Sequence, residues 1–88
     1  MKRSPDFLVR QVAGKYVAVP LGKATSTFNG MLTLNATGVF LWEQLEQEKT
    51  AEELVQAICG KYEVSPEQAM ADVTAFTQKL ISVGAIIE

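Results

Sequence analysis

The stretch from Leu34 to Leu45, LNATGVFLWEQL, constrains the fold of this chain most, because a single residue in it separates a strand pattern from a helix pattern. Asn35 suits a helix N-cap, since its side-chain oxygen can accept a hydrogen bond from a backbone N–H of the first turn. Leu41, Trp42 and Leu45 then fall on one side of the helix. Trp42 is the only tryptophan, and we expect it to pack the first helix against the other helices.

The residues before this stretch are typical of short strands. They predict three strands, at about residues 7–13, 16–19 and 31–34. The first two form a hairpin with a tight turn at Gly14-Lys15. In the third, Leu32 and Leu34 alternate with Met31 and Thr33 and are expected to face the core. The first six residues are polar, contain a proline and are expected to fray.

The residues after Asn35 predict three helices, at about residues 36–46, 51–61 and 66–83. Thr50 and Ser65 are the expected N-caps of the second and third helices. Cys59 is expected on the buried stripe of the second helix. The predicted fold is therefore α+β and winged-helix-like: an N-terminal three-stranded antiparallel sheet followed by a three-helix bundle, in one domain of 88 residues.

The composition excludes several classes of function. The chain has no histidine and one cysteine, so neither a Ser-His nor a Cys-His catalytic pair can form and no zinc site of the usual spacing exists. We therefore expect no enzymatic activity, no metal and no cofactor. The net charge of −2 without a basic cluster gives no general attraction for nucleic acid or anionic membranes. A single cysteine and the absence of a signal-peptide pattern favour the cytoplasm.

Three functions remain. One is a structural subunit that dimerises or docks a partner through Phe40. Another is a winged-helix DNA-binding protein, but the third helix has only Lys79 to contact DNA phosphates, and it also carries the acidic Glu67 and Asp72. The third is a peptide-binding protein that captures an extended peptide by adding it as a strand to the edge of residues 31–34.

One flank of the third helix bears on the peptide hypothesis. This flank is small or apolar where a surface helix would carry charge, and it consists of Met70, Thr74, Thr77 and Ile81. Either the buried face of the helix is wide, or this flank forms one wall of a peptide groove.

The later part of the chain resembles the PqqD-like family, coenzyme PQQ synthesis protein D. The resemblance covers about residues 34–87 and rests on motifs in a fixed order. These are Leu34-Asn35-x-Thr37, Leu41-Trp42-x-x-Leu45, Thr50-x-Glu52-Glu53-Leu54, Tyr62-x-Val64-Ser65 and Asp72-Val73-x-x-Phe76-x-x-x-Leu80. The sequence departs from the family at Glu48-Lys49, where a glycine often stands.

The resemblance implies a RiPP recognition element, a non-catalytic adaptor that binds the leader segment of a precursor peptide and presents it to a modifying enzyme, often a radical SAM protein. In such proteins the leader adds as a strand beside the third strand and lies against the third helix. The implied peptide-binding residues are Met31, Leu32, Thr33 and Leu34 by backbone pairing, and, by the flank argument, Met70, Val73, Thr74, Thr77 and Ile81. The sequence leaves open the peptide, the enzyme, the pathway, the roles of Asp72 and Phe40, and the choice between a monomer and a hairpin-exchanged homodimer.

Overall fold

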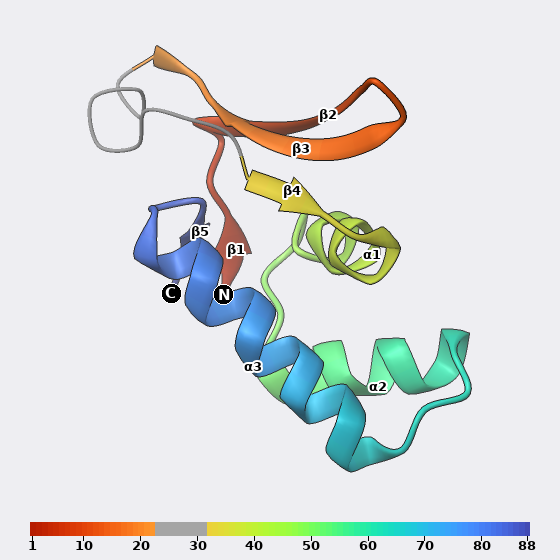
Figure 1. The fold of residues 1–88 in the computed structure, drawn as a ribbon. Coiled ribbons are helices and arrows are strands. Elements are labelled where there is room, and N and C mark those ends of the chain that lie inside the picture. The colour runs from red at the N-terminus through yellow and green to blue at the C-terminus, as the bar shows by residue number, and fades with distance from the viewer. Residues whose placement is uncertain (23–31) are drawn as a thin grey trace.

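The computed structural model describes residues 1–22 and 32–88, so Met31 lies outside the described residues. The elements in chain order are β1 (Lys2–Arg3), β2 (Phe7–Val12), β3 (Lys15–Pro20), β4 (Leu32–Leu34), α1 (Ala36–Gln44), α2 (Ala51–Lys61), α3 (Pro66–Ser82) and β5 (Ile86–Ile87). A three-stranded antiparallel sheet thus precedes three helices, which confirms the predicted α+β fold (Figure 1). The first helix ends two residues earlier than expected and the third helix one residue earlier.

The larger sheet has the order β2-β3-β4, with β3 in the centre. Ala18 of β3 pairs with Val9 on one side and with Leu32 on the other, and it is fully buried on the core face. The hairpin turns at Ala13 and Gly14, whose φ angles of 53° and 78° are both positive, as a type I′ turn requires. The expected turn at Gly14-Lys15 is wrong by one residue, because Lys15 already pairs with Val12.

The N-terminal segment is ordered, so the expectation that it frays is wrong. β1 pairs antiparallel with β5, near the other end of the chain. The backbone N–H of Arg3 donates to the carbonyl of Leu45 at 3.0 Å, and that of Ser4 donates to the carbonyl of Ala85 at 2.8 Å. Ser4 is buried as a result. These long-range bonds fix the segment that leads into β2 against the end of α1.

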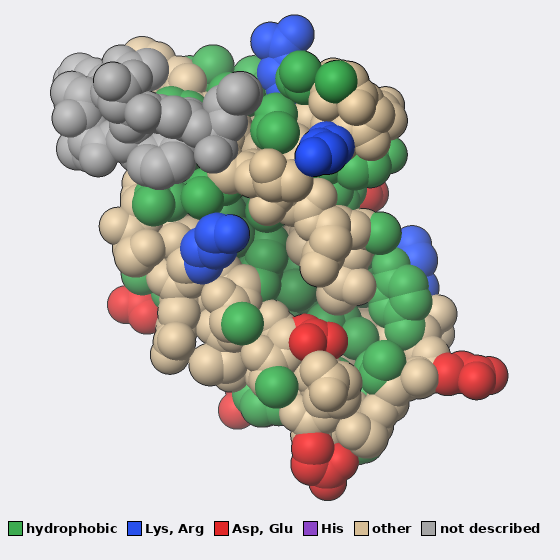
Figure 2. All heavy atoms as spheres, viewed as in Figure 1, with side chains coloured by type: hydrophobic (Ala, Val, Ile, Leu, Met, Phe, Trp, Pro, Cys, Tyr) green, Lys and Arg blue, Asp and Glu red, His purple; other side chains and the backbone are tan. Residues whose placement is uncertain are grey.

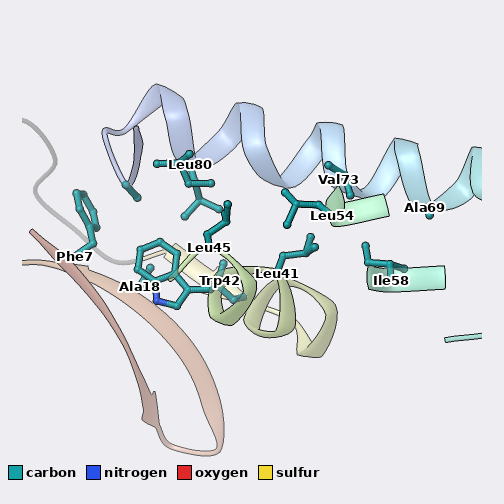
Figure 3. Close-up of a cluster of buried hydrophobic side chains, with 13 residues drawn as sticks. Phe7, Ala18, Leu41, Trp42, Leu45, Leu54, Ile58, Ala69, Val73 and Leu80 are labelled. Atoms are coloured by element: carbon teal, nitrogen blue, oxygen red, sulfur yellow. The ribbon is translucent and has the colours of Figure 1, made fainter. Parts of the chain in front are cut away.

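The three helices and the sheet enclose one core. Figure 3 shows Ala69, Val73 and Leu80 of α3 facing side chains from α1 and α2. Leu45, Leu54 and Leu80 are each 0% exposed. Trp42 is buried as expected, with the guanidinium of Arg3 5.8 Å from its ring centroid. Burying side chains of this size stabilises the fold by about 1.5–3 kcal/mol each.

Side-chain caps begin all three helices as the sequence predicts. Asn35, Thr50 and Ser65 each accept a hydrogen bond from a backbone N–H three residues later. Glu53 closes a capping box by accepting from the N–H of Thr50 at 2.9 Å. The prediction that Cys59 lies on the buried stripe of α2 is wrong. Leu54 and Ile58 form the buried face of this helix, and Cys59 is exposed. In the described residues, no helix combines the length and hydrophobicity needed to cross a membrane.

Candidate functional site

The site begins at the free edge of β4. Within the described residues β4 pairs only with β3, so its other edge has no strand beside it. A hollow of about 260 Å³ lies along this edge and is bounded on the far side by α3. Thr33, Leu34 and Asn35 all line the hollow. Because successive strand side chains point to opposite faces, consecutive lining residues place the hollow along the edge of the strand.

The floor of this hollow, hereafter the β4 groove, is apolar. Leu34, Leu41 and Leu80 line it and are at most 7% exposed, while Phe76 of α3 is half-buried there. Gly38 of α1 keeps the floor open. A Cβ at this position would stand 3.4 Å from Cε1 of Phe76 and 3.5 Å from Cβ of Leu34. A side chain at position 38 would therefore fill this part of the floor.

Opposite charges stand on the helical wall of the β4 groove. Asp72 and Lys79 both line it and are two helical turns apart on α3. The carboxylate of Asp72 accepts a hydrogen bond from the side chain of Gln68 at 2.9 Å. Figure 2 views the molecule from this side and shows hydrophobic side chains between β4 and α3, with one acidic and one basic side chain nearby. The wall therefore carries a negative charge nearer the start of α3 and a positive charge nearer its end.

The β4 groove is lined by few charged groups. Its lining has one carboxylate and one ammonium group among apolar and small polar side chains. In the part of the chain that the structure describes, no three His, Cys, Asp or Glu side chains come together in a way that could hold a metal ion. What the groove offers a ligand is a row of backbone donors and acceptors beside an apolar floor.

The family model described as coenzyme PQQ synthesis protein D (PqqD) matches residues 15–86. The chain belongs to the PqqD family. This confirms the resemblance found in the sequence and extends it to β3. Among curated proteins, none matches this PqqD-family chain.

Two solved structures share the PqqD-like fold of this chain. One is described as TbiB1 in complex with the TbiA(beta) leader peptide; it has a TM-score of 0.74, is 27% identical, and the match covers 97% of this chain and 93% of that one. The other is described as lasso peptide synthetase B1 complexed with the leader peptide, with a TM-score of 0.74, 21% identity, and coverage of 99% and 96%. The second likeness shows the fold alone.

Of the residues expected to pair with a peptide backbone, Leu32, Thr33 and Leu34 form β4. The five side chains expected on α3 do not line the β4 groove. They are Val73 and Thr77, which are buried; Met70 and Thr74, which are exposed; and Ile81, which is half-buried. The peptide-binding role assigned to these five stays a prediction, and the geometry of the groove lends it no support.

The groove residues that sequence reasoning did not select lie on the opposite flank of α3. Asp72, Phe76 and Lys79 follow one another at spacings of four and three residues, which places them on one helix face. The sequence does contain a signal for these residues: their spacing places one aromatic ring and two opposite charges on the same helix face. Phe40, whose role the sequence left open, packs edge-on against Tyr62 with ring centroids 6.0 Å apart.

Proposed function

We propose that this chain is a non-catalytic adaptor that binds the leader segment of a ribosomally made precursor peptide and presents it to a modifying enzyme. The observation that carries the proposal is the open edge of β4 beside the apolar β4 groove. Membership of the PqqD family supports it. So do the two structures of similar fold, both of which are described as complexes with a leader peptide.

In the proposed complex the leader extends the sheet as a strand next to β4. Backbone hydrogen bonds supply the pairing, each with a net contribution of about 0.5–1.5 kcal/mol. One apolar leader side chain enters the floor between Leu41 and Phe76, which adds about 1.5–3 kcal/mol. An acidic leader residue near Lys79 and a basic one near Asp72 set the direction of the peptide.

We also propose that the modifying enzyme is a radical SAM protein acting in the cytoplasm, in the synthesis of PQQ or of another modified peptide. The family name connects relatives of this chain with coenzyme PQQ synthesis. An adaptor that holds the leader leaves the enzyme free to act on the rest of the precursor, which explains why the β4 groove needs no catalytic groups.

An NMR titration tests the proposal. The isotopically labelled protein is titrated with a synthetic leader peptide of the precursor encoded beside its gene. We expect chemical-shift changes at the amides of Leu32–Leu34, which form the open strand β4, and at those of the α3 residues Asp72, Phe76 and Lys79, which line the β4 groove. Absence of any change at Leu32–Leu34 would refute binding by strand addition.

Two alanine variants distinguish the two flanks of α3. Phe76→Ala removes a ring from the floor of the β4 groove and is expected to weaken leader binding at least tenfold. Met70→Ala changes an exposed side chain outside the groove and serves as the matched control, with less than a twofold effect expected. Thermal melts of both variants show whether the fold is retained. The reverse order of effects would favour the flank chosen from the sequence and reject the groove described here.

A further inference from the structure

Gly38 lies at the floor of the β4 groove, in the first turn of α1. It lines the hollow although the residue itself is buried. Glycine is less favourable than alanine in a helix, because its backbone loses more conformational freedom on folding. A glycine at this position therefore has a reason other than helix formation.

The backbone conformation at position 38 does not require glycine. Among the described residues, positive φ angles occur at Ala13, Gly14, Gly22 and Gly84, and not at Gly38. A helical position with a negative φ accepts alanine without strain. The reason for glycine thus lies in the space around its Cα.

The packing around Gly38 leaves room for one methyl group. A Cβ added there would stand 3.4 Å from Cε1 of Phe76 and 3.5 Å from Cβ of Leu34, which are ordinary van der Waals distances. Its closest approach, 3.3 Å to Oδ1 of Asn35, is tight but could be relieved by a small shift. Because Gly38, Phe76 and Leu34 all line the β4 groove, what the methyl group would take away is open space in the floor.

The surroundings of Gly38 favour an apolar guest side chain. Leu34, Leu41 and Leu80 form the floor, and each is at most 7% exposed. In the part of the chain that the structure describes, no buried side-chain nitrogen or oxygen lacks a hydrogen-bond partner. A polar guest among these leucines would therefore lose its hydrogen bonds to water without gaining others.

We propose that Gly38 determines the specificity of the β4 groove: by lacking a side chain, it keeps the floor deep enough for a large apolar leader side chain of the size of leucine. This inference rests on the proposed function, since it concerns the leader side chain that enters between Leu41 and Phe76. It adds the class of that side chain and the residue that limits its size. A methyl group at position 38 would occupy part of the same space, so a leucine would lose its advantage over an alanine.

Leader peptides that differ at one position test this inference. The anchor is the apolar leader residue whose side chain gives nuclear Overhauser effects to Phe76, and its leucine and alanine forms are compared by isothermal titration calorimetry. We expect the parent protein to prefer the leucine form by about tenfold or more, and Gly38→Ala to prefer it by about threefold or less.

Gly60→Ala is the matched control. Gly60 is also a helical glycine, near the end of α2, and a Cβ added there would meet nothing within 4 Å. Both substitutions therefore replace glycine by alanine in a helix, but only Gly38→Ala changes the β4 groove. Gly60→Ala should keep the leucine preference of the parent protein.

A second variant keeps the test decisive if Gly38→Ala folds poorly, which thermal melts of all variants show. Gly38→Ala/Phe76→Leu removes the Cε1 atom that the new methyl group would meet, and it should again prefer the leucine form, by about fivefold or more. A double variant without this preference would assign the effect of the methyl group to the cap at Asn35 and overturn the role of Gly38 in the floor.

Three other results would overturn the role of Gly38 while leaving leader binding in place. They are an unchanged leucine preference in Gly38→Ala, an equal loss of preference in Gly60→Ala, and a bound leader without an apolar anchor against Phe76. A parent protein that binds no form of the leader would instead overturn the proposed function, and the role of Gly38 with it.

Discussion

Replacement of Asn35 by alanine should destabilise the whole domain, because one hydrogen bond at the start of α1 is lost. The side-chain Oδ1 of Asn35 accepts from the backbone N–H of Gly38 at 2.8 Å. Gly38 is buried, so in Asn35→Ala this N–H would have neither a protein acceptor nor free access to water. Losses of N-cap side chains typically cost about 1 kcal/mol, and a buried donor left unpaired costs up to about 3 kcal/mol. We expect a loss of about 1–2 kcal/mol in the free energy of unfolding.

The assay is urea and thermal unfolding followed by circular dichroism. In a chain of this size each kcal/mol lowers the melting temperature by about 4–8 °C, so Asn35→Ala should melt about 4–16 °C below the parent protein. Asn35→Asp is the matched control, because it keeps the acceptor. The first turn of α1 contains no acidic residue, so the added charge should stabilise the helix N-terminus by about 0.3–1 kcal/mol.

Comparing the stability of the two variants tests whether the acceptor oxygen at position 35 stabilises the domain. If Asn35→Asp is as unstable as Asn35→Ala, the acceptor oxygen is not what stabilises this position. If Asn35→Ala unfolds like the parent, the N–H of Gly38 has found another acceptor, and the step from β4 into α1 does not depend on the cap.

Two further predictions concern the core and the second helix. Leu45→Ala should lower the free energy of unfolding by about 3–5 kcal/mol, because Leu45 is 0% exposed and its removal leaves a cavity; a loss below 1 kcal/mol in urea unfolding would contradict this packing. The hydrogen bond from the backbone N–H of Thr50 holds the pKa of Glu53 below its ordinary value, so the stability that it contributes is present above the ordinary pKa and is lost as the pH falls through the lowered one. NMR titration should therefore find a low pKa for Glu53, and Glu53→Gln should unfold with a weaker dependence on acidic pH; a pKa for Glu53 at the ordinary value would count against the capping box.

Local chemistry explains what the sequence could predict. The caps at Asn35, Thr50 and Ser65 depend on a side chain and a backbone N–H three residues apart, so neighbours in sequence are enough to recognise them. The β2–β3 hairpin is likewise a contact between neighbours. Its turn was misplaced by one residue because Ala13 adopts a positive φ, which sequence patterns assign to glycine.

Contacts between distant segments account for what the sequence could not predict. β1 and β5 are two residues each and pair across almost the whole chain, so neither carries a periodic pattern of its own. The choice of flank on α3 has a similar cause. The stripe containing Val73 and Leu80 was recognisable, but which side of that stripe turns toward β4 depends on how the helix crosses the sheet. The spacing of Asp72, Phe76 and Lys79 marks one helix face, but only the three-dimensional structure shows that this face borders β4.

The antiparallel pairing of Lys2 with Ile87 makes the two ends of the described fold close neighbours (Figure 1). A linker of a few residues could therefore join them into a ring at little entropic cost. New ends could then be opened at Ala13-Gly14, in the exposed hairpin turn, to give a circular permutant that keeps every strand and helix. For protein engineers this means that a cargo can be attached at either of two separate places on the same scaffold.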